Sequence, residues 1–214
     1  MTSLAYASKD RTLENLFREI AAEPSRHARF LNTISMLEYI GARKIMKSQQ
    51  AHEFDIELLA HVSEETKHAW LLKRLAQQID KGSTETYSEN HLLCGKEAEG
   101  YIQGLDDAAE KALENATDPS SGSSLGWLNY LYTSLLIEER ADIFYTAYTG
   151  VLEELGMAHV LKAIMKDESK HLAQMAQLIH KVDPDAEQRL SSLREIEVAG
   201  FTRWENSLWA SLED

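Results

Sequence analysis

The stretches SEETKHAW, residues 63–70, and MKDESKHL, residues 165–172, carry one pattern: an acid, a glutamate, any residue, a lysine and a histidine. A glutamate and a histidine three positions apart share one face of a helix, so each stretch offers a carboxylate and an imidazole to a common point. In a chain this rich in glutamate, chance alone would place about one such pair. The two copies therefore indicate a site only if other residues repeat with them.

The composition predicts an all-α protein. The chain has 214 residues, of which 43% are hydrophobic. Residues that favour helices are abundant, and only 10 glycines and 3 prolines occur. This length suits one domain with a substantial core. We expect a single domain over residues 1–214.

Charge and cysteine content exclude several classes of function. With 22 basic against 35 acidic residues, the net charge of −13 argues against nucleic acid as a partner. Residues 1–17 lack the apolar segment of a signal peptide, and no run of 18 apolar residues occurs, so we expect a cytoplasmic protein without a membrane partner. The single cysteine, Cys94, excludes an internal disulfide and any site built from paired cysteines. It is expected to be a free thiol.

Apolar periodicity predicts a core of four long helices with a long crossover in the middle. The crossover consists of the polar stretch 82–95, a modest helix and the loop 117–126. Ser25 is the predicted N-cap of the first core helix. Two flanking helices are expected to be packing elements. The expected helices span residues 11–22, 25–48, 52–81, 96–116, 124–149, 157–181 and 185–212.

Two further glutamates repeat with the paired motifs. Glu38 precedes Glu65 by 27 residues, and Glu138 precedes Glu168 by 30, so the two halves are offset by about 100 residues. On antiparallel helices that rise 1.5 Å per residue, each pair reaches nearly one height. Four carboxylates and two imidazoles are therefore expected to converge.

Such a cluster requires cations, because four buried carboxylates would otherwise repel one another and lose their hydration. Two divalent ions balance the four negative charges, and mixed oxygen and nitrogen ligation suits iron or manganese. The sequence therefore predicts a centre of two metal ions per chain. Its expected ligands, which are also the expected catalytic residues, are Glu38, Glu65, His68, Glu138, Glu168 and His171.

Through these six residues the chain resembles the ferritin-like di-iron carboxylate superfamily over roughly residues 25–181. The segment SLLIEERADIFYTAY, residues 134–148, followed by KDESKHL, is most similar to small oxygen-activating enzymes such as aldehyde-deformylating oxygenases and tRNA-modifying hydroxylases. The resemblance implies a ferritin-like four-helix bundle with extra terminal helices that binds two Fe ions, or Mn. It also implies an oxidoreductase that activates O₂ to oxidise an organic substrate, with an electron-donor protein as a further partner and a homodimer as the expected assembly. The resemblance does not identify the substrate.

Other functions of such a centre stay open. A ferroxidase for iron storage is weakened by the two extra helices and by the second histidine, which storage ferritins usually lack. A rubrerythrin-like peroxidase is weakened by the missing cysteine pairs, and a manganese catalase remains compatible with the residues.

Residues beside the expected ligands have two interpretations each. Glu138 is preferred over Glu139 because it continues an apolar row. Asp167 and Glu64 either hydrogen-bond a ligand histidine from the neighbouring helix or are solvated acids. Asp142 either orients a histidine or lies near the end of the bundle.

His61, one turn before Glu65, is either a seventh ligand or, by preference, a core histidine. Core packing is likewise preferred for three tyrosines, whose alternative roles are a hydrogen bond to a bound ligand or the carrying of a radical. Gly41 is expected to allow close helix packing rather than to leave room for substrate or oxygen. The tyrosines are Tyr39, Tyr132 and Tyr145.

Overall fold

The computed structural model describes residues 11–48, 53–114 and 125–213, which form seven α-helices and no strand. The expected all-α class is therefore confirmed for this part of the chain, and the helix boundaries lie within a few residues of those expected. A short 3₁₀ helix, η2 (Glu89–His91), separates α3 from α4. The helices are α1 (Leu13–Ala21), α2 (Pro24–Ser48), α3 (Ile56–Ile79), α4 (Gly95–Leu113), α5 (Leu125–Glu154), α6 (His159–Val182) and α7 (Ala186–Ala210).

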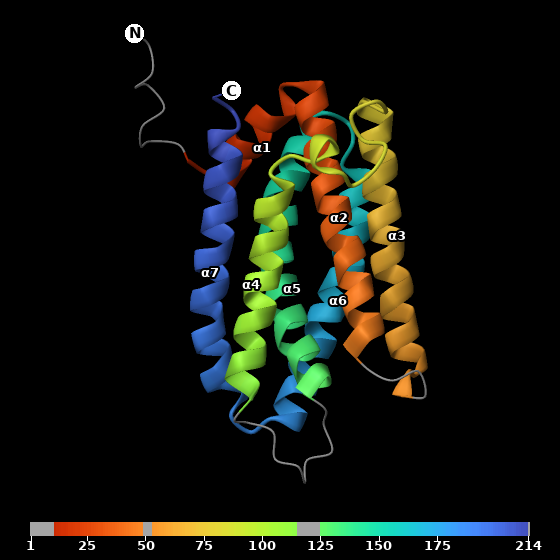
Figure 1. Cartoon of the computed structure of the whole chain (residues 1–214). Coiled ribbons are helices and arrows are strands. Elements are labelled where there is room, and N and C mark those ends of the chain that lie inside the picture. The colour runs from red at the N-terminus through yellow and green to blue at the C-terminus, as the bar shows by residue number, and fades with distance from the viewer. Residues whose placement is uncertain (1–10, 49–52, 115–124, 214) are drawn as a thin grey trace.

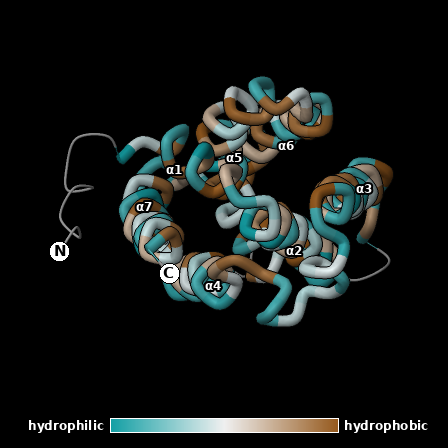
Figure 2. Tube along the Cα trace, turned by 90° about the horizontal axis from the view of Figure 1, so that it is seen from above, coloured by the Kyte–Doolittle hydropathy of each residue, from teal (hydrophilic) through white to brown (hydrophobic). Residues whose placement is uncertain are grey.

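The helices form one bundle in which the chain repeatedly reverses direction (Figure 1). Helices α2 and α3 lie side by side and antiparallel, as do α5 and α6, and these two pairs contact each other through α2 with α5 and α3 with α6. Helix α4 leads the chain back along the bundle to the end at which α5 begins. Helices α4 and α7 pack together beside α5, as the view along the bundle in Figure 2 shows.

Helix starts follow local chemistry, with one correction to the expected caps. Helix α2 begins at Pro24, whose fixed φ and missing N–H suit the first position of a helix. The Glu23 carboxylate accepts the backbone N–H groups of Ser25 and Arg26 at 2.9 and 2.5 Å. Ser25 is therefore inside the first turn and is not the cap. Helix α3 is capped by Asp55, and its expected start at residue 52 lies outside the described residues.

The apolar core consists of two clusters, and the polar motifs lie between them along each central helix. In α2 the first cluster ends at Ile34 and the second contains Ile45; in α5 the second cluster extends to Leu136 and the first resumes at Phe144. The glutamates at 38 and 138 occupy these intervals. The bundle is thus apolar toward both ends and carries charge in its middle. None of the described helices combines the length and apolar character that crossing a membrane requires.

Candidate metal centre

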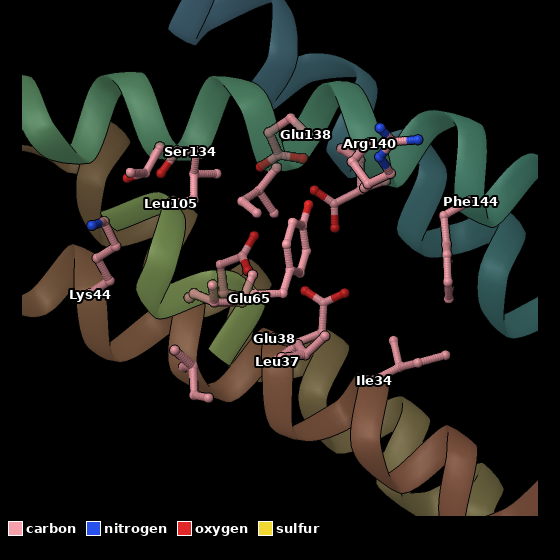
Figure 3. A pocket seen from close by; sticks show the side chains of 18 of the residues that line it. Ile34, Leu37, Glu38, Lys44, Glu65, Leu105, Ser134, Glu138, Arg140 and Phe144 are labelled. Carbon is pink, nitrogen blue, oxygen red and sulfur yellow. The ribbon is translucent and has the colours of Figure 1, made fainter. Parts of the chain in front are cut away.

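All six residues expected to bind metal converge in the middle of the bundle. Helix α2 supplies one glutamate and α5 another, whereas α3 and α6 each supply a glutamate and a histidine from the paired motifs. Both histidines are fully buried, and three of the four glutamates are at most 7% exposed. Figure 3 shows Glu38 and Glu65 facing Glu138 from the opposite side of a shared space.

The side chains form two groups, each able to hold one metal ion. Every residue in a group offers one ligand atom, and these atoms lie within 4.8 Å of one another. Glu65 belongs to both groups, so the two positions are adjacent. The first group is Glu38, Glu65, His68 and Glu168, and the second is His61, Glu65, Glu138 and His171.

Three atoms of the cluster have no hydrogen-bond partner among the described residues although they are buried. They are Oε1 of Glu65, Nδ1 of His68 and Oε1 of Glu168. The last two approach to 2.9 Å, but not in hydrogen-bond geometry. Burial of an unsatisfied polar atom costs about 1–3 kcal/mol, so native proteins seldom leave three of them together. Oxygen and imidazole nitrogen are suitable ligands for a divalent metal, and the residues therefore fit such an ion.

The repeated acid before each motif glutamate holds the histidine of the opposite motif. Asp167 on α6 lies 3.2 Å from Nε2 of His68 on α3. In return, Glu64 on α3 lies 2.8 Å from Nε2 of His171 on α6. Of the two interpretations that the sequence left open for these acids, the structure shows the hydrogen bond from a neighbouring helix for both. They turn Nδ1 of each ring toward the glutamates, because the opposite nitrogen is already occupied.

The lysine of each motif also contacts the acid of the opposite motif. Lys67 lies 3.4 Å from Asp167, and Lys170 lies 3.6 Å from Glu64. Each motif thus presents a lysine and a histidine to the acid of the other motif. The reciprocal contact between α3 and α6 therefore accounts for the acid, the lysine and the histidine of the pattern.

Burial governs the protonation of the carboxylates in the absence of cations. It raises the pKa of Glu38 and of Glu138 well above the usual range, and the neighbouring carboxylates raise both further. Burial and the charge of Glu168 raise the pKa of Glu65 to about 7. Three glutamates therefore resist carrying their charges side by side without positive partners.

The histidines supply part of that positive charge in the metal-free protein. Burial opposes ionisation of Glu168, but the hydrogen bond with His171 and the nearby imidazole of His68 outweigh it and hold the pKa of Glu168 far below its usual value. Burial similarly acts to lower the pKa of both histidines, whereas the surrounding carboxylates raise it to about 9 in each. A metal ion must displace these protons, so binding is coupled to proton release.

The structure places Glu138 and Glu139 on different sides of α5. Glu138 is buried in the cluster. Glu139 instead accepts two hydrogen bonds from Arg194 on α7, at 2.9 and 2.6 Å. The preferred helical phase therefore agrees with the structure.

Other expected roles hold only in part. Asp142 is exposed on α5. Tyr132 is a core residue whose hydroxyl donates to Asp183 at 2.7 Å. Tyr145 is also buried, but its hydroxyl donates to Glu38, so its role exceeds packing. The core role expected for Tyr39 is wrong: it is 42% exposed and stacks on Tyr87, because its side of α2 faces the crossover loop.

Gly41 makes space for a carboxylate. A Cβ atom at this position would lie 2.9 Å from Oε2 of Glu65, closer than side-chain carbons normally approach another atom. The contact that Gly41 permits, one turn from Glu38, is therefore with a side chain of the cluster and is not the close approach of two helices that the sequence predicted.

His61 and Tyr130 form a buried pair beside the second group. Nδ1 of His61 lies 2.8 Å from the Tyr130 hydroxyl, and its Nε2 faces Glu65 and Glu138 at 3.4 and 3.8 Å. Tyr130 was not anticipated from the sequence, since it lies 69 positions away and its pattern is that of an ordinary core residue.

An apolar cavity of about 120 Å³ borders the centre between α2, α4, α5 and α7. Glu38, Glu65 and Glu138 form part of its wall, as Figure 3 shows. Two basic residues in the wall are neutralised locally: Arg140 donates to Glu197 at 2.8 and 2.7 Å, and Lys44 to Asp106 and Asn129. The remaining lining is mainly apolar, including Ile34, Leu37, Leu105, Ile137, Ala141, Phe144, Phe201 and Trp204.

Comparison of the chain with protein-family models, with curated proteins and with solved structures gives no match.

Proposed function

We propose that this protein is a dimetal oxidoreductase of the ferritin-like di-iron carboxylate class, which activates O₂ to oxidise an apolar organic molecule. Iron is the favoured metal and manganese the alternative. When bound, a reduced pair of such ions would supply the electrons for O₂ activation. The residues that would hold them are the six expected ligands.

The protein's own contribution is a pre-arranged set of ligands in an apolar surrounding. Asp167 and Glu64 fix the rings of His68 and His171, and Tyr145 donates to Glu38. Such outer hydrogen bonds typically contribute 10- to 100-fold to metal affinity. Burial of the glutamates keeps bulk water from the metal positions.

The proposal that the substrate is organic rests on the apolar cavity, because the glutamates of the centre lie in its wall. A site that passes oxidised iron to a mineral needs a polar route, whereas this space is lined by isoleucine, leucine, phenylalanine and tryptophan. Apolar cavities of about 150 Å³ bind benzene. A cavity of about 120 Å³ therefore suits a small aromatic ring or a short aliphatic chain.

The metal site is tested by comparing Glu168→Ala with Glu139→Ala. Glu168 contacts both histidines of the centre, so its removal should lower metal affinity by at least about 100-fold. Glu139 has its partner on α7, and its variant should retain about two ions per chain. Plasma emission analysis after dialysis provides the measurement. Equal metal content in the two variants would contradict the site.

The oxidation of an organic substrate is tested with iron-loaded, reduced protein supplied with O₂ and a panel of short alkanes and monocyclic aromatics. Oxidised products are expected from the wild type. Ala141→Leu, which adds bulk to the cavity wall beside Glu138, should keep both ions and lose product formation. With excess Fe²⁺ in air, light scattering should show no growth of an iron core. Accumulation of hundreds of ions per particle would establish the storage function instead.

A further inference from the structure

His61 occupies the position of a ligand in the second group. It lies on α3 one helical turn before Glu65 and is 6% exposed. Its ring centroid is 3.9 Å from that of His171, with the planes inclined by 35°. The sequence favoured a core histidine here, and the surroundings of its two nitrogens decide between the two interpretations.

Nε2 of His61 is too far from the glutamates for a good hydrogen bond and close enough for shared ligation. Its distances to Oε1 of Glu65 and of Glu138 are 3.4 and 3.8 Å, whereas N–H···O bonds normally end near 3.2 Å. Two atoms that each lie about 2.1 Å from one metal ion are separated by at most about 4.2 Å. Both distances satisfy this limit.

Nδ1 of His61 is held in a way that leaves Nε2 free to bind. The Tyr130 oxygen at 2.8 Å can accept the Nδ1 proton, which is the tautomer with a lone pair on Nε2. Metal-binding histidines usually donate their second N–H to an outer partner, as His68 and His171 do to Asp167 and Glu64. Here a phenol takes the place of the carboxylate.

We propose that His61 is a seventh ligand of the centre and binds, through Nε2, the ion held by Glu138 and His171. This proposal rests on the dimetal function proposed above. The imidazole is neutral and leaves the balance of four carboxylates against two divalent ions unchanged. It makes the centre asymmetric, with two imidazoles at one position and one at the other. Both positions border the apolar cavity, through Glu38 and Glu168 at one and through His61 and Glu138 at the other.

The bundle contains a matched control for this histidine. His27 on α2 is also buried, and its Nε2 lies 2.6 Å from the hydroxyl of Tyr148 on α5, outside both ligand groups. His61→Phe replaces the imidazole with an aromatic ring that has no nitrogen to bind a metal. His27→Phe makes the same change at the control site. Titration of the metal-free proteins with Co²⁺ should show the second ion bound at least about tenfold more weakly in His61→Phe alone.

A measurement on the unmodified protein keeps the proposal testable if His61→Phe does not fold. In Co²⁺-loaded wild type, each bound imidazole contributes one exchangeable N–H proton that the ion shifts far outside the ordinary proton spectrum. In the wild type we expect three such resonances, from His61, His68 and His171. In His61→Phe only the resonances of His68 and His171 should remain.

The outcomes separate this proposal from the dimetal function. Two shifted resonances in the wild type, or unchanged Co²⁺ affinity in His61→Phe, would show that His61 is a core histidine while the six-ligand centre stands. Failure of the wild type and of His27→Phe to bind any Co²⁺ would overturn the centre itself and the seventh ligand with it.

Discussion

Two buried histidines of this bundle each bond to a tyrosine of α5, yet they lie in different surroundings. His27 contacts Tyr148, whose ring packs with those of Phe17, Phe30 and Phe144. His61 contacts Tyr130 and otherwise faces glutamates and a second imidazole. The same pair of residue types is therefore part of an apolar core in one region and of a polar cluster in the other. The two histidines differ in the groups that surround the part of the imidazole ring not bonded to tyrosine.

The two regions also differ in why their histidines resist protonation. Burial alone lowers the pKa of His27 to about 4. Burial and, to a smaller extent, the neighbouring His171 lower the pKa of His61 to about 3, against the opposing effect of nearby carboxylates. Acid pH therefore acts on the first region through the burial of one histidine, whereas in the second region several carboxylates and imidazoles act on one another.

The largest expected effect concerns acid stability in the aromatic region. Below pH 6.5 the unfolded chain protonates His27 while the folded protein does not until about pH 4, so stability is complete above pH 6.5 and is lost as the pH falls toward 4. A difference of this size corresponds to about 3 kcal/mol in total. His27→Gln should remove that part of the pH dependence. Urea unfolding of both metal-free proteins at pH 7.5 and 5 measures it, and identical losses in the two proteins would contradict the assignment.

The next effect concerns the hydrogen bonds that orient the histidines of the polar region. Asp167→Asn and Glu64→Gln keep the shape of the side chain and remove the charge that holds His68 and His171. We expect each to weaken metal binding by about 10- to 100-fold while the fold is retained. Competition with a chelator provides the affinities. Asp185→Asn, on the exposed start of α7, is the control and should bind metal like the wild type.

If the two variants bind metal as tightly as the wild type, the reciprocal contact between α3 and α6 is only structural. If only one of them weakens binding, the two halves of the centre are less alike than their shared pattern indicates.

The smallest expected effect comes from adding a single methyl group beside the polar cluster, at Gly41. Gly41→Ala improves helix propensity by about 1 kcal/mol but places a Cβ atom against the carboxylate of Glu65. We expect the metal-free protein to be as stable as the wild type or more so, and metal affinity to fall about tenfold as Glu65 moves. Gly104→Ala on α4 meets no atom within 4 Å and should give the stability gain without the loss of affinity. Equal affinities in the two variants would show that Glu65 accommodates the methyl group at its present position.

The sequence predicted the central helices and the convergence of six side chains because both depend on periodicity. Apolar residues at three- and four-residue steps specify which face of a helix is buried, and Glu65, His68, Glu138, Glu168 and His171 fall on those faces. The internal repeat then placed the motifs at matching heights. For the acid beside each motif glutamate the sequence left two interpretations open, a hydrogen bond to a histidine or a solvated side chain, and the folded structure shows the hydrogen bond.

Tertiary structure decided the contacts that no periodicity encodes. The partnership of His61 with Tyr130 and that of Arg140 with Glu197 join residues 69 and 57 positions apart. The place of Tyr39 on the outer side of α2 depends on where the crossover loop runs. A repeating pattern fixes the direction of a side chain from its own helix, but its partner is set by the packing of another helix, whose approach only the folded chain determines.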